Sequence, residues 1–183
     1  MENQKNDNLN LLEAVVQNTE MGKNTLEQIV PMTEEPRFKA ELLRQRNIYR
    51  ELNQEARTAI TACGGTAQGQ STMAKLNTKM GISMKTLTDR STRNLAEMLS
   101  EGSSQGVMDC IKSQKDYPDA APGSKRLMQK LQDFEEDSLC TVLLDKDGIL
   151  PKKGRGDDTA FWVSRPSQAQ FSDACNEFWW GLN

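Results

Sequence analysis

The chain has 183 residues, enough for one domain with a sizeable core and a short appended segment. Its 23 basic and 26 acidic residues give a formal net charge of −3, without the basic excess that nucleic-acid binding requires. It contains no histidine, which excludes a histidine base, a histidine-assisted nucleophile and histidine-ligated metal or haem. No apolar run approaches the ~20 residues that cross a bilayer, and the beginning of the chain is polar, so we expect a cytoplasmic protein.

The cysteines are too far apart in the sequence to suggest a metal knuckle. Cys63, Cys110, Cys140 and Cys175 form no Cys-x-x-Cys pair. In a cytoplasmic protein this distribution favours free, mostly buried thiols over a disulfide framework.

The first predicted helix runs from about Asn8 to Val30 and ends at Pro31. Its apolar and small residues recur at spacings of three and four, which places them on one face. These residues are Leu12, Val15, Thr19, Gly22, Leu26 and Ile29.

The second predicted helix begins near Pro36, with Thr33 as its expected cap, and ends at Gly64 and Gly65. The same spacing predicts one buried face along it. That face consists of Phe38, Leu42, Gln45, Tyr49, Leu52, Ala56, Ala59 and Cys63.

The stretch from Gly64 to Thr72, GGTAQGQST, differs by one residue from a phosphate-binding loop. Gln70 stands where that loop needs a lysine, and a helix precedes it where the loop needs a strand. We therefore interpret the stretch as the connection between two helices and predict that a nucleotide does not bind there.

Three further helices are predicted after this connection, the first of them short. The face of the short helix consists of Met73, Leu76, Met80, Met84 and Leu87. The face of the next helix consists of Leu95, Leu99, Gly102, Gly106 and Cys110. The last helix runs from Ser124 to about Leu144, and its face consists of Leu127, Leu131, Phe134 and Ser138. Gly102 and Gly106, four residues apart, predict a tight helix crossing. Because no segment alternates with a strand period, we predict an all-α, antiparallel up-and-down four-helix bundle with an extra short helix.

This bundle is predicted to occupy residues 1–144. Residues 145–183 are charged and rich in glycine at first and rich in aromatic residues at the end, and contain all three tryptophans. We expect them to form a separate, irregular, partly disordered tail.

A carboxylate-bridged metal pair is one use of a four-helix bundle, but it also needs histidines. A set built from carboxylates alone is the alternative that the sequence leaves open, with Glu20, Glu51, Glu55, Glu97 and Glu101 as its candidates. Such glutamates lie beside the apolar faces, so we interpret them as solvated flanks. We predict no metal site, no cofactor and no catalytic residue.

Residues 11–136 resemble a ferritin-like, rubrerythrin-like bacterial bundle family, similar to the domain of unknown function 2383 group. The resemblance rests on NTEMGKNTLEQIVP, on the segment from Ala62 to Cys110 that contains STRNLAEMLSEGSSQGVMD, and on KDYPDAAPG. It implies a ferritin-like fold, while no iron-binding residue carries over, because Gly102, Ser103 and Ser104 stand where an acidic residue is expected. After Glu136 the sequence departs from the family pattern, either as a real addition or as an out-of-frame read-through.

These observations lead us to expect a non-enzymatic structural or interaction protein that self-associates or binds a partner protein, and does not bind nucleic acid. Two alternatives remain open. One is the carboxylate-only metal protein, and the other is a membrane-surface binder that uses the basic, methionine-rich third helix and the aromatic tail.

Overall fold

The computed structural model describes residues 2–67 and 89–146, and this part of the chain is helical without any strand. It contains α1 (Glu2–Ile29), the short 3-10 helix η1 (Val30–Met32), α2 (Pro36–Ala62), α4 (Thr92–Asp116) and α5 (Pro122–Lys146). The all-α prediction is therefore confirmed for these residues. The predicted short helix at 73–87 and residues 147–183 of the predicted tail lie outside the described residues.

Local signals fix where the first two helices end and begin. Pro31 lies in η1, and α1 ends just before it, as predicted. The cap of α2 is Glu35, whose carboxylate accepts hydrogen bonds from the backbone N–H groups of Arg37 and Phe38. The prediction of Thr33 as the cap is wrong, because the Thr33 hydroxyl instead donates to the carbonyl oxygen of Ile29 at 3.0 Å.

The glycines after α2 stop the helix, as the sequence indicated. Gly64 adopts a φ of 72°, the left-handed conformation that glycine takes without strain. Its N–H donates to the carbonyl of Thr61 at 2.9 Å. The second half of the GGTAQGQST stretch lies outside the described residues, so the prediction that it does not bind a nucleotide stays a prediction.

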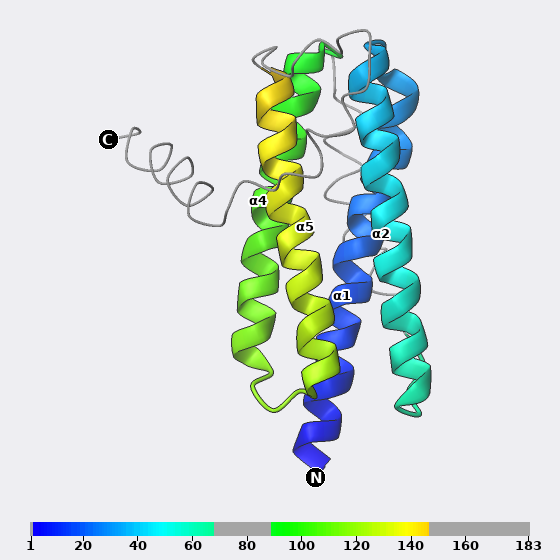
Figure 1. Cartoon of the computed structure of the whole chain (residues 1–183), viewed down its shortest axis with the longest axis vertical. Helices are drawn as coiled ribbons and strands as arrows, with labels where there is room; N and C mark the ends of the chain where they lie inside the picture. Colours follow the sequence, from blue (N-terminus) through cyan, green and yellow to red (C-terminus); the bar gives the residue numbers. More distant parts are fainter. Residues whose placement is uncertain (1, 68–88, 147–183) are drawn as a thin grey trace, which may run out of the picture. The chain divides into compact units, whose positions relative to one another are not determined.

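The helices pair as two hairpins, α1 with α2 and α4 with α5, and these two pairs make the most extensive contacts. Figure 1 shows the members of each pair running side by side in opposite directions. Helix α1 also contacts α4 and α5, and α2 contacts α5, so the two hairpins share one core.

The predicted apolar faces supply this core. All the predicted face residues of α5 are buried, and so are those of α1 except Gly22, which is half-buried. On α2 the face turns slightly near its end, so that Ile60 is buried and Ala59 is half-buried. On α4 the prediction fails at Gly102, which is exposed, while Ser103 is buried in its place.

Polar contacts join segments that are distant in the sequence. The Asn8 side chain on α1 accepts from the backbone N–H of Ala121 and from the Ser124 hydroxyl at the start of α5. Arg57 on α2 forms an ion pair with Glu20 on α1. Among the described residues, no helix is both long and apolar enough to span a membrane.

Candidate functional site

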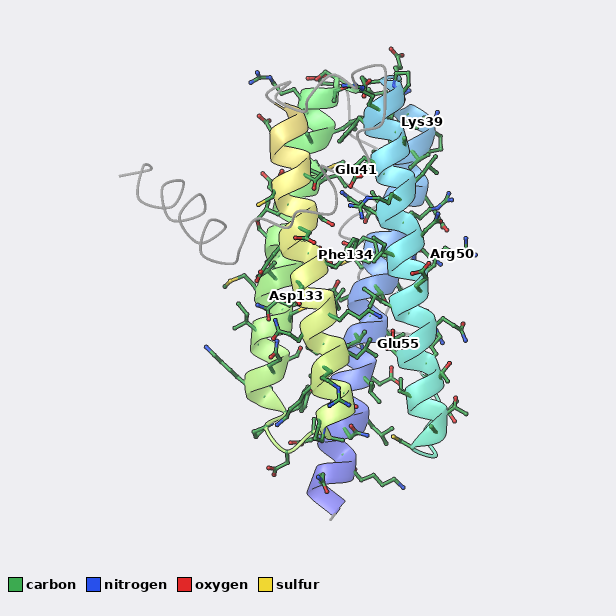
Figure 2. The ribbon with its side chains drawn as sticks, viewed as in Figure 1. Lys39, Glu41, Arg50, Glu55, Asp133 and Phe134 are labelled. Atoms are coloured by element: carbon green, nitrogen blue, oxygen red, sulfur yellow. The ribbon has the colours of Figure 1, made fainter. Side chains whose placement is uncertain are left out.

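A buried carboxyl, that of Glu135 on α5, lies where the two hairpins meet. Glu135 is 2% exposed. Its Oε1 accepts a hydrogen bond from the Tyr49 hydroxyl of α2 at 2.8 Å. The Tyr49 ring packs edge-on against Phe134, with centroids 4.8 Å apart and planes at 87°. Figure 2 labels Phe134 together with its exposed neighbour Asp133, which shows how α5 places adjacent residues in different surroundings.

Two glycines make room for the side chains of Tyr49 and Glu135. A Cβ at Gly22 of α1 would lie 2.3 Å from the Tyr49 ring, and a Cβ at Gly106 of α4 would lie 2.7 Å from the Glu135 carboxyl carbon. In each hairpin, therefore, one large polar side chain of one helix packs against a glycine of the other helix. The predicted tight helix crossing at Gly102 and Gly106 is wrong in this respect, because Gly106 receives a side chain and Gly102 faces open space.

We call Tyr49, Glu135 and the neighbouring Ser103, Gly106 and Cys110 of α4 the Tyr49–Glu135 cluster. Burial is the main cause of the pKa shifts of its titratable side chains. Burial raises the pKa of Glu135 to about 7, against the lowering effect of the hydrogen bonds with Tyr49 and Ser103. Burial and the Glu135 charge raise the pKa of Tyr49 well above its usual value. The pKa of Cys110 is raised to about 12, mainly by burial.

Two buried side-chain oxygens in the described part of α5 have no hydrogen-bond partner. They are Oε2 of Glu135 and the hydroxyl oxygen of Ser138, one turn further along. A buried, ionised carboxylate oxygen without a donor is unfavourable, whereas a protonated one is itself a donor. The surroundings of Glu135 therefore fit the neutral carboxylic acid.

A cavity of about 320 Å³ lies beside this cluster, between α1 and α4. Asn18 and Cys110 line it, and Asn18 Nδ2 also donates to the carbonyl oxygen of Gly106 at 3.3 Å. Asp109 and Asp116 provide negative charge at its wall, and Lys112 provides a positive charge between them.

The five glutamates of the carboxylate-only alternative are not brought together as a site. Glu20 pairs with Arg57, and Glu55 pairs with Lys130 at 2.8 Å on the surface. Glu51, Glu97 and Glu101 are exposed. No group of three or more acidic or cysteine side chains that could hold a metal ion occurs in residues 2–67 and 89–146.

Sequence reasoning missed Glu135, although the sequence contains a signal for it. Met128, Leu131, Glu135, Ser138 and Val142 follow one another at spacings of three and four, and all five are buried. A glutamate inside such a series is either buried or interrupts the core, which makes it a candidate for a special role.

Comparison with known proteins points to a class of enzyme. Residues 126–183, which include Glu135 and most of α5, match the streptomycin adenylyltransferase family. This match covers less than half of the chain and lies mainly outside the described residues. No solved structure matches the chain.

The curated relatives carry a related name, aminoglycoside 6-adenylyltransferase. The protein from Bacillus subtilis (strain 168) is 46% identical over 43 residues, which are 24% of this chain and 15% of the relative. That from Staphylococcus aureus is 38% identical over 45 residues, or 25% of this chain and 16% of the relative. That from Campylobacter jejuni is 41% identical over 46 residues, with the same two shares. The chain thus spans about one sixth of the length of these relatives.

These matches overturn the ferritin-like resemblance and the expectation of a non-enzymatic protein. The similar proteins are nucleotidyltransferases, which are enzymes. The resemblance to the domain of unknown function 2383 group relied on helix and glycine spacing, which many helical bundles share and which does not define function. The lack of histidine excludes histidine chemistry, but phosphoryl transfer depends on positioning and electrostatics instead.

The family match favours one of the two alternatives left open for the tail, a real addition over an out-of-frame read-through. The matched range extends from α5 to the last residue, Asn183. An out-of-frame translation would not reproduce the sequence pattern of a protein family. The aromatic tail is therefore a coherent part of the matched sequence.

Proposed function

We propose that this chain takes part in the adenylylation of an aminoglycoside, and that residues 126–183 contribute to that activity. The match of this range to the streptomycin adenylyltransferase family carries the proposal. In this reaction a hydroxyl oxygen of the aminoglycoside attacks the α-phosphorus of ATP, a new phosphoester bond forms, and pyrophosphate leaves. The hydroxyl proton passes to a base or to solvent.

The composition of the matched range suits a cationic sugar. Aminoglycosides carry several protonated amino or guanidino groups, which carboxylates bind through charge-assisted hydrogen bonds. Acidic residues outnumber basic ones in the range, and Asp157 and Asp158 are adjacent in it. Aromatic side chains such as Trp162, Trp179 and Trp180 attract cations to the faces of their rings.

Adenylyl transfer by the full chain is tested directly. The chain is incubated with ATP, Mg²⁺ and streptomycin, and adenylylated streptomycin is detected by mass spectrometry while pyrophosphate release is followed. We expect product only when all three are present. Absence of product at high enzyme concentration would refute catalysis by this chain.

Binding is tested separately through tryptophan fluorescence. Because all three tryptophans lie in the matched range, intrinsic emission reports on this range alone. We expect streptomycin to change the emission saturably, and sucrose, an uncharged sugar, to leave it unchanged. The double variant D157N/D158N should weaken the effect. An emission that does not respond to streptomycin would contradict the role given to residues 126–183.

For the fold, we propose an antiparallel up-and-down arrangement in which the two hairpins form one four-helix bundle. Contacts of α1 with α4 and α5, and of α2 with α5, support it. The predicted helix at 73–87 would belong to the connection between α2 and α4. Because ATP is plentiful in the cytoplasm, we propose that the protein acts there.

A further inference from the structure

We propose that the Glu135 carboxyl is a proton-operated latch that holds the α1–α2 hairpin against the α4–α5 hairpin, closed when neutral and released when ionised. The latch is independent of the adenylylation proposed above.

The contacts of Glu135 span the junction of the two hairpins. Its Oε1 accepts from Tyr49 of α2 at 2.8 Å, and the Tyr49 ring rests on Gly22 of α1. Its carboxyl carbon faces Gly106 of α4. One side chain of α5 therefore meets, directly or through Tyr49, the three other described long helices.

The unsatisfied oxygens indicate which state the site is built for. Tyr49 satisfies Oε1, while Oε2 and the Ser138 hydroxyl oxygen are buried without partners. A proton on Oε2 turns it into a donor. Its candidate acceptors are the hydroxyl of Ser103, which interacts with Glu135, and the unpartnered hydroxyl of Ser138, one turn further along α5. An ionised Glu135 would be a buried charge whose desolvation outweighs the hydrogen bonds with the Tyr49 and Ser103 hydroxyls, so ionisation favours a state in which water reaches the carboxyl.

Among the described residues, the titratable groups that act on Glu135 provide no positive charge. The Tyr49 hydroxyl faces it from α2, Cys110 and Asp109 act on it from α4, and Glu136 follows it on α5. Near the cluster α1 presents Gly22 and Asn18, which carry no charge. Asp109 disfavours a second negative charge at Glu135 and thus reinforces the effect of burial.

The direction of the pH dependence follows from these surroundings. The pKa of Glu135 is about 7 in the closed state and near the ordinary 4.5 when the carboxyl reaches water. The closed state is therefore fully favoured below pH 4.5, and this advantage is lost as the pH rises toward 7.

Cys110 provides a readout of opening, because it is 1% exposed and interacts with Glu135. A thiol reagent such as iodoacetamide labels it only when the helices separate. In one experiment the full chain is labelled from pH 5.5 to pH 8, and modification of Cys110 and of the half-buried Cys63 is measured by peptide mass spectrometry. Cys63 in the same sample corrects for the effect of pH on thiol reactivity.

We expect the Cys110 rate, corrected in this way, to rise roughly 10- to 30-fold more across this range in the wild type than in E135Q. Glutamine keeps an acceptor for Tyr49 and a donor for Ser138, but cannot ionise. The variant D133N, which removes an exposed carboxylate of the same helix, should follow the wild type.

A second variant keeps the test decisive if E135Q is poorly folded. Replacing Tyr49 by phenylalanine removes the donor that favours the ionised carboxyl, so Y49F should shift the midpoint of the labelling transition to higher pH. Equal pH profiles for wild type and E135Q, or for wild type and Y49F, would overturn the latch.

Discussion

Replacing Gly22 by alanine should destabilise the protein markedly, because Tyr49 occupies the space of the new methyl group. The added Cβ would lie 2.3 Å from Cζ and 2.5 Å from Cε1 of the ring. The ring cannot withdraw easily, since Phe134 packs against it and Glu135 binds its hydroxyl. Overpacking of this kind costs about 1–3 kcal/mol, while alanine regains about 1 kcal/mol of helix propensity.

The contact distance is far below an ordinary van der Waals separation, so we expect the upper part of that range and a net loss of about 2 kcal/mol. For a chain of this size the loss corresponds to a decrease in Tm of roughly 4–8 °C. Gly102→Ala is the matched control, because a Cβ there meets nothing within 4 Å. That variant should gain about 1 kcal/mol and raise Tm by roughly 2–4 °C.

Thermal and urea unfolding, followed by far-ultraviolet circular dichroism as a measure of helix content, compare both variants. A double-mutant cycle then tests the cause, since Gly22→Ala should cost much less in a Tyr49→Ala background. If Gly22→Ala were as stable as Gly102→Ala, or if its cost were the same with and without the ring, the reasoning from the Gly22–Tyr49 contact would be refuted.

Two predictions concern the ends of α2, and both are checked by urea unfolding. Glu35→Ala removes the side chain that caps two N–H groups and should cost about 1 kcal/mol, whereas Glu34→Ala, at an exposed position, should cost less than about 0.5 kcal/mol. Gly64→Ala should cost about 1 kcal/mol, because its φ of 72° strains a residue with a Cβ although the surrounding space is open. Gly64→Asn should recover part of that loss, and equal stability of all three residues at position 64 would contradict this explanation.

The buried faces of the helices could largely be predicted from the sequence. Spacings of three and four identify a helix face because they average to the 3.6-residue period. The errors occur where two adjacent positions compete for that face. At 59 and 60, and again at 102 and 103, the second residue is buried, and only the partner helix decides between them.

The Tyr49–Glu135 cluster could not be assembled from the sequence, because its members come from positions 86 residues apart. Tyr49 was expected on a buried face, but its partner was not. On average a glutamate is solvated, and the missing side chain at Gly106 makes room for this one in the core. The aromatic tail was noticed in the sequence, but composition alone does not reveal a family.

The boundary of the family match does not coincide with a boundary of folding. The match begins at Arg126, near the start of α5, whereas the apolar side of that helix lies in the core shared with α1, α2 and α4. Among the described side chains in the matched part of α5, the buried apolar ones are Leu127, Met128, Leu131, Phe134 and Val142. At roughly 1.5–3 kcal/mol each, they contribute about 10 kcal/mol, which is comparable to the whole stability of a domain.

A chain shortened to residues 1–125 should therefore lose cooperative unfolding, since the other helices would expose the faces that α5 covers. A chain shortened to residues 1–146 retains α5 and the Tyr49–Glu135 hydrogen bond, and should unfold cooperatively. Urea titrations of the two chains compare them directly. A cooperative transition in residues 1–125 would show that α5 is dispensable for the core, and would leave the matched segment and the preceding helices as independent units. If residues 1–125 show no cooperative transition, the part of the adenylyltransferase match that lies in α5 packs here against helices that lie outside the match.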